Sequence, residues 1–118
     1  MYVDMKSIDG NKLRGHLETM ILSVLERGEA HGLDILRSLE HAGCGVLRMK
    51  EGSLYPALYR LEEAGFVRGV WEGESRGRRG PRRRFYRLTR KGRRELVRGR
   101  EDWKDFVQVI GAIMGAPA

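Results

Sequence analysis

The sequence of 118 residues lacks the features that mark secreted, membrane-spanning and disulfide-stabilised proteins. Its one cysteine, Cys44, cannot form a disulfide within the chain, and no apolar run approaches the roughly 20 residues that span a bilayer. The first eleven residues carry Asp4 and Asp9 and have no apolar centre, which argues against a secretory signal. We therefore expect a cytoplasmic protein with no membrane partner.

Signatures of catalysis and of metal binding are also missing from the sequence. It has no nucleophile elbow, no phosphate-binding glycine loop and no paired acidic motif. The three histidines, His16, His31 and His41, do not combine with Cys44 in a metal-ligand spacing. We therefore expect neither an enzyme nor a bound metal or cofactor.

Positive charge, in contrast, is concentrated in one short segment. Residues 76–94 hold eleven of the 23 basic residues and no acidic residue, whereas the rest of the chain has twelve basic residues and 16 acidic ones. The net charge of +7 therefore comes from this segment alone. A solvated surface strip usually mixes both signs, so the segment indicates a polyanionic partner.

Hydrophobic periodicity predicts three short helices before the basic segment. They extend over about Leu13–Gly28, His31–His41 and Ser53–Gly65. The hydroxyl of Ser53 can cap the third helix, and Pro56 fits within the first turn, where a missing N–H costs nothing.

Two strands and a last helix follow. Phe66–Glu72 and Arg84–Thr89 are rich in valine and aromatic residues, and the glycine-containing segment Gly73–Arg83 lies between them. This pattern predicts a hairpin with a long basic tip. Thr89 can cap a helix that runs to about Met114, with the apolar spacing of a helix that packs along another helix.

The order of these elements predicts a fold that is mainly α with a small β-hairpin, a winged helix-turn-helix. We divide the chain into an N-terminal arm (residues 1–12), a winged-helix DNA-binding domain (13–89) and a C-terminal dimerisation helix (90–118). Such a fold can place its third helix in the major groove of duplex DNA, where each base pair presents a distinct pattern. The hairpin arginines can lie along phosphates or in the minor groove.

Several sequence blocks within these elements resemble the PadR family of transcriptional regulators. The blocks, which lie between residues 13 and 96, are LETMILSVL (17–25), HGLDI (31–35), EGSLYPALYRLE (51–62) and RFYRLT (84–89), followed by Gly92. The resemblance implies a homodimeric regulator, usually a repressor, that binds double-stranded DNA at an inverted-repeat operator. The single short C-terminal helix is similar to that of the family's short subgroup, in which this helix dimerises.

Candidate DNA contacts lie on the third helix and in the hairpin. Tyr55 matches a family tyrosine that contacts the DNA backbone, although it could instead pack over Tyr59, one turn away. Ser53 could contact a phosphate or serve only as a cap. The full set is Lys50, Ser53, Tyr55, Tyr59, Arg60, Arg78, Arg79, Arg82 and Arg83.

Trp103, in the last helix, has two compatible interpretations. A tryptophan in an apolar stripe commonly anchors an interface, here that of a homodimer. Some drug-responsive PadR-like proteins carry a tryptophan at the matching place and hold flat aromatic compounds between subunits, which implies a possible small hydrophobic or aromatic effector. The candidate effector and dimer-interface residues are Leu96, Trp103, Phe106, Val107, Ile110 and Met114.

Two other functions fit the same charge distribution. A non-specific nucleic-acid-binding winged-helix protein would show little preference among sequences at moderate salt. A protein-interaction module with an acidic partner would not bind DNA even at low salt. The apolar stripe of the last helix suits a symmetric dimer, and we therefore favour inverted-repeat recognition.

Overall fold

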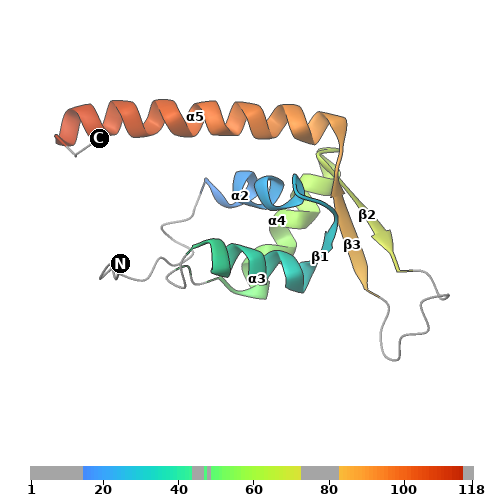
Figure 1. Ribbon diagram of the computed structural model, residues 1–118. Helices are drawn as coiled ribbons and strands as arrows, with labels where there is room; N and C mark the ends of the chain where they lie inside the picture. The colour runs from blue at the N-terminus through green and yellow to red at the C-terminus, as the bar shows by residue number, and fades with distance from the viewer. Residues whose placement is uncertain (1–14, 44–46, 48, 73–82, 116–118) are drawn as a thin grey trace.

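The chain forms four helices and three strands in the residues that the computed structural model describes, which are 15–43, 47, 49–72 and 83–115. The predicted arm, residues 1–12, lies outside them, and so do the tip arginines Arg78, Arg79 and Arg82. The last helix runs across the others, and the hairpin stands at one end (Figure 1). The elements are α2 (Leu17–Leu25), β1 (Ala30–His31), α3 (Gly32–Ala42), α4 (Glu51–Glu63), β2 (Val67–Trp71), β3 (Arg84–Leu88) and α5 (Arg90–Met114).

One apolar core lies among α2, α3 and α4, because each helix gathers apolar side chains on one face. Ile21 of α2, Ile35 of α3 and Leu58 of α4 are completely buried in it. Tyr86 of β3 and Leu96 of α5 belong to the same cluster. The sheet and the first half of α5 are therefore packed onto the three helices, and the predicted mainly α fold with a hairpin is confirmed.

Helix α4 begins two residues earlier than predicted. Its first residue is Glu51, Lys50 is the N-cap, and no side chain caps the helix. Ser53 lies inside the first turn, where its N–H donates to the carbonyl of Lys50 at 3.0 Å, so the predicted cap at Ser53 is wrong. The end agrees with the prediction: Gly65 has a φ of +80°, a left-handed conformation that glycine adopts without strain.

The strands form one antiparallel sheet in the order β1-β3-β2. The two longer strands confirm the predicted hairpin, whereas β1 was not predicted, because two residues are too few to show an alternating pattern. Ala30 pairs with Tyr86, and His31 pairs with Phe85. This pairing joins the start of α3 to the hairpin, which we call the wing.

Helix α5 approaches the rest of the fold closely through two glycines. A Cβ on Gly92 would collide with the backbone carbonyl of Phe66, and one on Gly99 would lie 2.6 Å from Oγ1 of Thr19 in α2. The hydroxyl of Thr89 accepts a hydrogen bond from the N–H of Gly92 at 3.0 Å, which confirms the predicted cap. The first half of α5 is thus fixed against α2 and the base of the wing.

The second half of α5 projects beyond α2 (Figure 1). Residues 101–109 are all exposed. Leu96, in the first half, lies in the core, and the division of the chain at residues 89 and 90 remains a prediction. No helix in the described ranges is both long enough and apolar enough to span a membrane.

Candidate nucleic-acid interface

The outer face of α4 carries most of the predicted helix contacts. The apolar residues Leu54, Ala57, Leu58 and Leu61 face the core. Tyr59, on the opposite side, is 65% exposed, and Lys50 and Ser53 at the start of the helix are exposed as well. These exposed residues give α4 an outer face that is free to contact another molecule.

Tyr55 lies at the edge of this face and packs against the first residue of α3. A Cβ on Gly32 would lie 2.7 Å from Cε1 and Cζ of the tyrosine ring, so the ring can adopt this position only over a glycine. The side chain remains 41% exposed. Burial raises the pKa of the Tyr55 hydroxyl, and the negative charge of Glu51 raises it further, so the hydroxyl stays a hydrogen-bond donor even at mildly alkaline pH.

Arg60, another predicted DNA contact, is held by a residue of α2. Its Nε donates to Oε1 of Glu18 at 2.6 Å. Both side chains are about half exposed, so the ion pair is weakly stabilising and its partners can exchange. In this structure Arg60 therefore joins α4 to α2.

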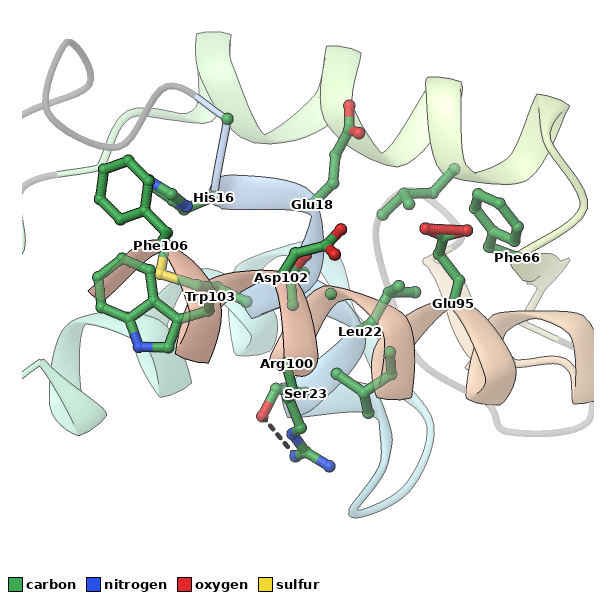
Figure 2. Close-up of a pocket in the computed structure, with 16 residues that line it drawn as sticks. His16, Glu18, Leu22, Ser23, Phe66, Glu95, Arg100, Asp102, Trp103 and Phe106 are labelled. Carbon is green, nitrogen blue, oxygen red and sulfur yellow. Dashed lines mark hydrogen bonds between the residues drawn. The ribbon is translucent and has the colours of Figure 1, made fainter. Parts of the chain in front are cut away.

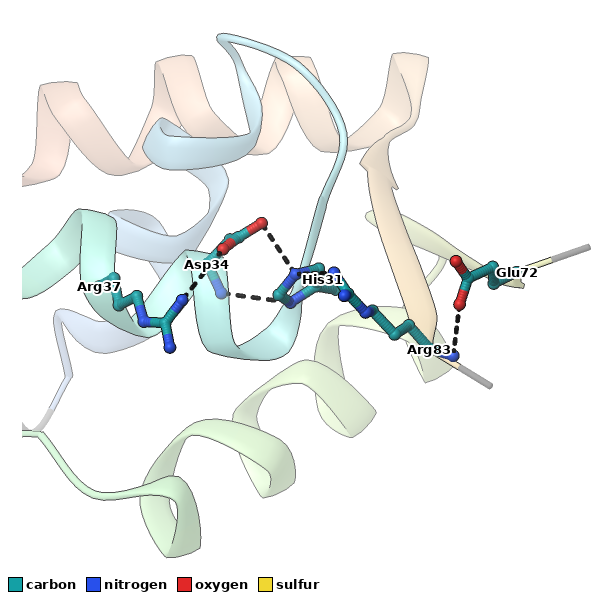
Figure 3. Close-up of polar contacts among 5 residues, drawn as sticks. All are labelled: His31, Asp34, Arg37, Glu72 and Arg83. Carbon is teal, nitrogen blue, oxygen red and sulfur yellow. Dashed lines mark hydrogen bonds and ion pairs between the residues drawn. The ribbon is translucent and has the colours of Figure 1, made fainter. Parts of the chain in front are cut away.

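The described wing arginine among the predicted contacts, Arg83, points toward the start of α3 (Figure 3). Its Nη1 lies 3.0 Å from Nε2 of His31, and its backbone N–H donates to Oε2 of Glu72 at 3.2 Å. His31 itself lies 2.9 Å from Oδ2 of Asp34 and caps α3. These contacts fix the tip-side end of the two wing strands against α3.

A second wing arginine, Arg84, was not among the predicted contacts, although it bridges the wing and α4. It donates to Oε2 of Glu62 at 2.5 Å and lies beside the rings of Trp71 and Tyr86. Side chains alternate along a strand, so Arg84 lies on the same face of β3 as Tyr86. This alternation could have identified Arg84 as a residue that faces the helices.

A groove between α2 and α5 is lined by three of the predicted effector and interface residues, Leu96, Trp103 and Phe106 (Figure 2). It has a volume of about 790 Å³. The rings of Trp103 and Phe106 are nearly parallel, with 19° between their planes and 5.9 Å between centroids. His16 meets both rings edge-on, at 5.1 and 5.8 Å. No sequence pattern indicated His16, because its place depends on how α2 crosses α5.

The predicted interface residues of α5 fall into two groups. Trp103, Phe106, Val107 and Met114 are between 47% and 71% exposed, and Ile110 is partly exposed. Leu96 is 1% exposed and packs in the core, so it cannot form part of an outer surface. The outer residues make an apolar strip that we call the α5 strip. In the part of the chain that the structure describes, no cluster of histidines and carboxylates could hold a metal ion.

Comparison with known proteins agrees with this architecture. The sequence profile described as "Transcriptional regulator PadR-like family" matches residues 21–98. An uncharacterized protein of Lysinibacillus sphaericus is 26% identical over 102 residues, which are 86% of this chain and 91% of that protein.

Solved structures of regulators share the fold over most of the chain. A transcriptional regulator from Clostridium thermocellum is 29% identical, with a TM-score of 0.78 over 87% of this chain and 97% of that one. A PadR family regulator from Clostridium difficile is 26% identical, with a TM-score of 0.72 over 85% and 99%. A PadR-like regulator from Bacillus cereus has the same identity and TM-score over 92% and 100%. The chain therefore belongs to the PadR-like family of transcriptional regulators and has their winged-helix DNA-binding fold.

Proposed function

We propose that this protein is a homodimeric repressor that binds an inverted-repeat operator through α4 and the wing. The observation that carries the proposal is the exposed face of α4 with Tyr55 and Tyr59, beside a wing that contains the chain's excess positive charge. The predicted contacts, including Arg78, Arg79 and Arg82 outside the described residues, belong to this proposal.

The contacts divide into two kinds by their chemistry. The arginines of the wing and Lys50 supply positive charge for phosphates, which gives affinity that falls steeply with salt. The outer face of α4, with Tyr59 at its centre, enters the major groove and reads base edges. Tyr55 donates its hydroxyl to the backbone and fixes the register of the helix.

Dimerisation in this proposal uses the α5 strip. An apolar strip of this length on one helix favours a second copy of the same helix, which buries both strips at once. With 25 residues at about 1.5 Å each, α5 is long enough to set the distance between two α4 helices. Recognition of successive major grooves needs that distance to be about 34 Å.

A small hydrophobic or aromatic effector would bind at Trp103 and Phe106, which line the groove and also belong to the α5 strip. Because both side chains line the groove between α5 and α2, a ligand bound there can change how α5 packs on α2. Such a change would also alter the distance between the two α4 helices of the dimer. Such a ligand would shift the population away from the DNA-binding arrangement and release the operator.

The experiment that tests the proposal is selection of bound duplexes from a random library, followed by titration of the selected and a scrambled duplex at two salt concentrations. We expect a twofold-symmetric sequence and a preference that persists at the higher salt. Equal binding that vanishes with salt would instead indicate a non-specific binder. Transcription from a promoter that carries the selected sequence should fall when the protein is added, and a rise would contradict repression.

A further inference from the structure

The ion pair between Glu62 of α4 and Arg84 of the wing has no role in the DNA contacts proposed above. We propose that Arg84 is a positioning residue which, through Glu62, fixes the angle between α4 and the wing and thereby makes the two elements fit one operator together. This inference rests on the proposed function, since the angle matters only if both elements contact the same DNA.

The first support is the partial burial of the pair. Nη2 of Arg84 donates to Oε2 of Glu62 at 2.5 Å, and the two side chains are only 28% and 32% exposed. The pair of Arg60 and Glu18, on the other side of α4, is 58% and 45% exposed. A charge-assisted hydrogen bond that is shielded from water is stronger and holds its geometry better than an exposed one.

The second support is that the guanidinium of Arg84 is enclosed by the wing. It lies 5.2 Å from the ring centroid of Trp71, the residue paired with it across the hairpin, and 5.8 Å from that of Tyr86. The arginine also lies close to Gly69 of β2, where an added Cβ would be only 2.6 Å from its Nε. Only a glycine on β2 therefore leaves room for Arg84 to reach α4.

These contacts join three elements at one side chain: α4 through Glu62, β2 through Gly69 and Trp71, and β3 through Arg84 itself. The neighbouring Arg83 fixes the same tip-side end of the strands to α3, through His31. The Glu62–Arg84 pair lies nearer to the hairpin tip than Tyr86, since Arg84 begins β3. It therefore holds the tip-side end of the wing to α4, while the Arg83–His31 contact holds it to α3.

The competing assignment is that Arg84 binds a DNA phosphate and that Glu62 merely occupies it in the free protein. The two assignments predict opposite effects of Glu62→Gln. If Arg84 binds DNA, the substitution frees it and raises affinity. If the pair positions the wing, the substitution lowers affinity for the operator and leaves binding to scrambled DNA nearly unchanged.

The test compares Glu62→Gln, Arg84→Met and Gly69→Ala in the full-length protein, with Arg87→Met as control, because Arg87 is an exposed arginine of the same strand. Gly69→Ala keeps both charges and displaces the guanidinium. We expect the ratio of affinities for the selected operator and scrambled duplex to fall about tenfold in the first three variants, similar to the loss from one mismatched base pair. The control removes one wing charge and leaves the Glu62–Arg84 pair intact, so it should weaken binding to both duplexes alike and keep the wild-type ratio.

Hydrogen exchange of the β2 and β3 amides in the DNA-free protein shows whether a substitution loosens the wing. It thereby distinguishes a purely structural role of the pair from a positioning role in DNA recognition. We expect faster exchange in Glu62→Gln and Gly69→Ala. Faster exchange with an unchanged affinity ratio would show that the pair is only structural and would overturn the proposal, as would a gain of affinity in Glu62→Gln. If the wild type itself does not distinguish the two duplexes, the proposed function fails, whatever the variants do.

Discussion

Glycines position two side chains of the proposed DNA-binding surface. Gly32 leaves space for the ring of Tyr55, and Gly69 leaves space for the guanidinium of Arg84. Neither glycine has a left-handed backbone, so both are required by close approach rather than by φ. A side chain at either position would move a functional group while leaving that group's own chemistry intact.

Removing the hydroxyl of Tyr55 should weaken DNA binding without unfolding the protein. Tyr55→Phe keeps the ring that packs on Gly32 and loses a hydrogen bond to a charged phosphate, worth about 1.5–3 kcal/mol. Gly32→Ala should weaken binding as well, because it displaces the intact tyrosine. Titration of the operator measures both effects, and thermal unfolding checks the fold. If Tyr55→Phe bound the operator with wild-type affinity, the Tyr55 hydroxyl would not be a DNA contact.

The buried tyrosine of the wing predicts a loss of stability at alkaline pH. Burial raises the pKa of Tyr86, with a smaller opposing effect from the positive charge of Arg84. The folded state therefore keeps its phenolic proton after the unfolded state begins to lose it, near pH 10. Its stabilisation is complete below that pH and is lost as the pH rises through the folded-state pKa.

Urea unfolding at pH 9 and pH 11 measures this loss. The free energy of unfolding should fall between the two pH values in the wild type and should fall less in Tyr86→Phe, which has no phenolic proton to lose. Equal losses in the two proteins would mean that Tyr86 does not contribute to the pH dependence.

At the scale of elements, each side of α4 is connected to a different neighbour. Glu18 and Arg60 join it to α2, and Glu62 and Arg84 join it to the wing. Helix α5 in turn is fixed to α2 by the close approach at Gly99 and by Arg100, which lies 2.9 Å from Oε1 of Glu26. A change in the packing of α5 can thus reach α4 through α2.

The packing of α5 can be tested with a matched pair of glycine substitutions. A Cβ on Gly92 would meet the backbone carbonyl of Phe66, which cannot move aside, whereas one on Gly111 would meet nothing within 4 Å. We expect Gly92→Ala to lower the free energy of unfolding by about 1–3 kcal/mol through overpacking. Gly111→Ala should raise it slightly, because alanine favours a helix. Equal stabilities would contradict the observed approach of α5 to the wing.

The sequence predicted those features that depend on local patterns. The apolar spacing around Ile21 and Leu58 indicated buried helical faces, and Thr89 and Gly65 indicated helix ends that the structure confirms. Features that depend on tertiary contacts were missed. Strand β1 exists only because β3 supplies its hydrogen bonds, and the serine signal at Ser53 did not decide where α4 begins.

The candidate site was predicted less completely than the fold, for the same reason. Tyr55 was identified by its sequence block, whereas the glycine beneath it at residue 32 was not, because the contact joins two helices. Arg84 and His16 were missed because their partners lie far away in the chain. Leu96 was assigned to the interface from the same periodicity that places it in the core.

At the scale of the whole molecule, the protein projects the second half of α5, with its apolar strip, away from its own core (Figure 1). Val107 is 47% exposed and Met114 is 71% exposed, on a helix whose first half is well packed. Contiguous apolar surface of this kind marks an interface. In our account, dimerisation covers this surface and sets the distance between the two α4 helices.

Effector binding should be visible in the fluorescence of Trp103. Because Trp71 also fluoresces, the measurement uses a Trp71→Phe background, which leaves one tryptophan. A flat aromatic probe that does not itself bind DNA should quench the remaining emission and lower operator affinity if it occupies the groove beside α5. Trp103→Leu in the unmodified background should lose the effect on affinity. Quenching without any change in DNA binding would argue against a regulatory role.

The most direct test of the account is one titration that compares a duplex carrying two inverted half-sites with a duplex of equal length in which one half-site is scrambled. A dimer that places both α4 helices on one face of DNA predicts much tighter binding to the intact repeat, and loss of that preference in a Val107→Asp variant that separates the subunits. Equal affinity of the wild type for both duplexes would contradict the dimeric, inverted-repeat mode of recognition.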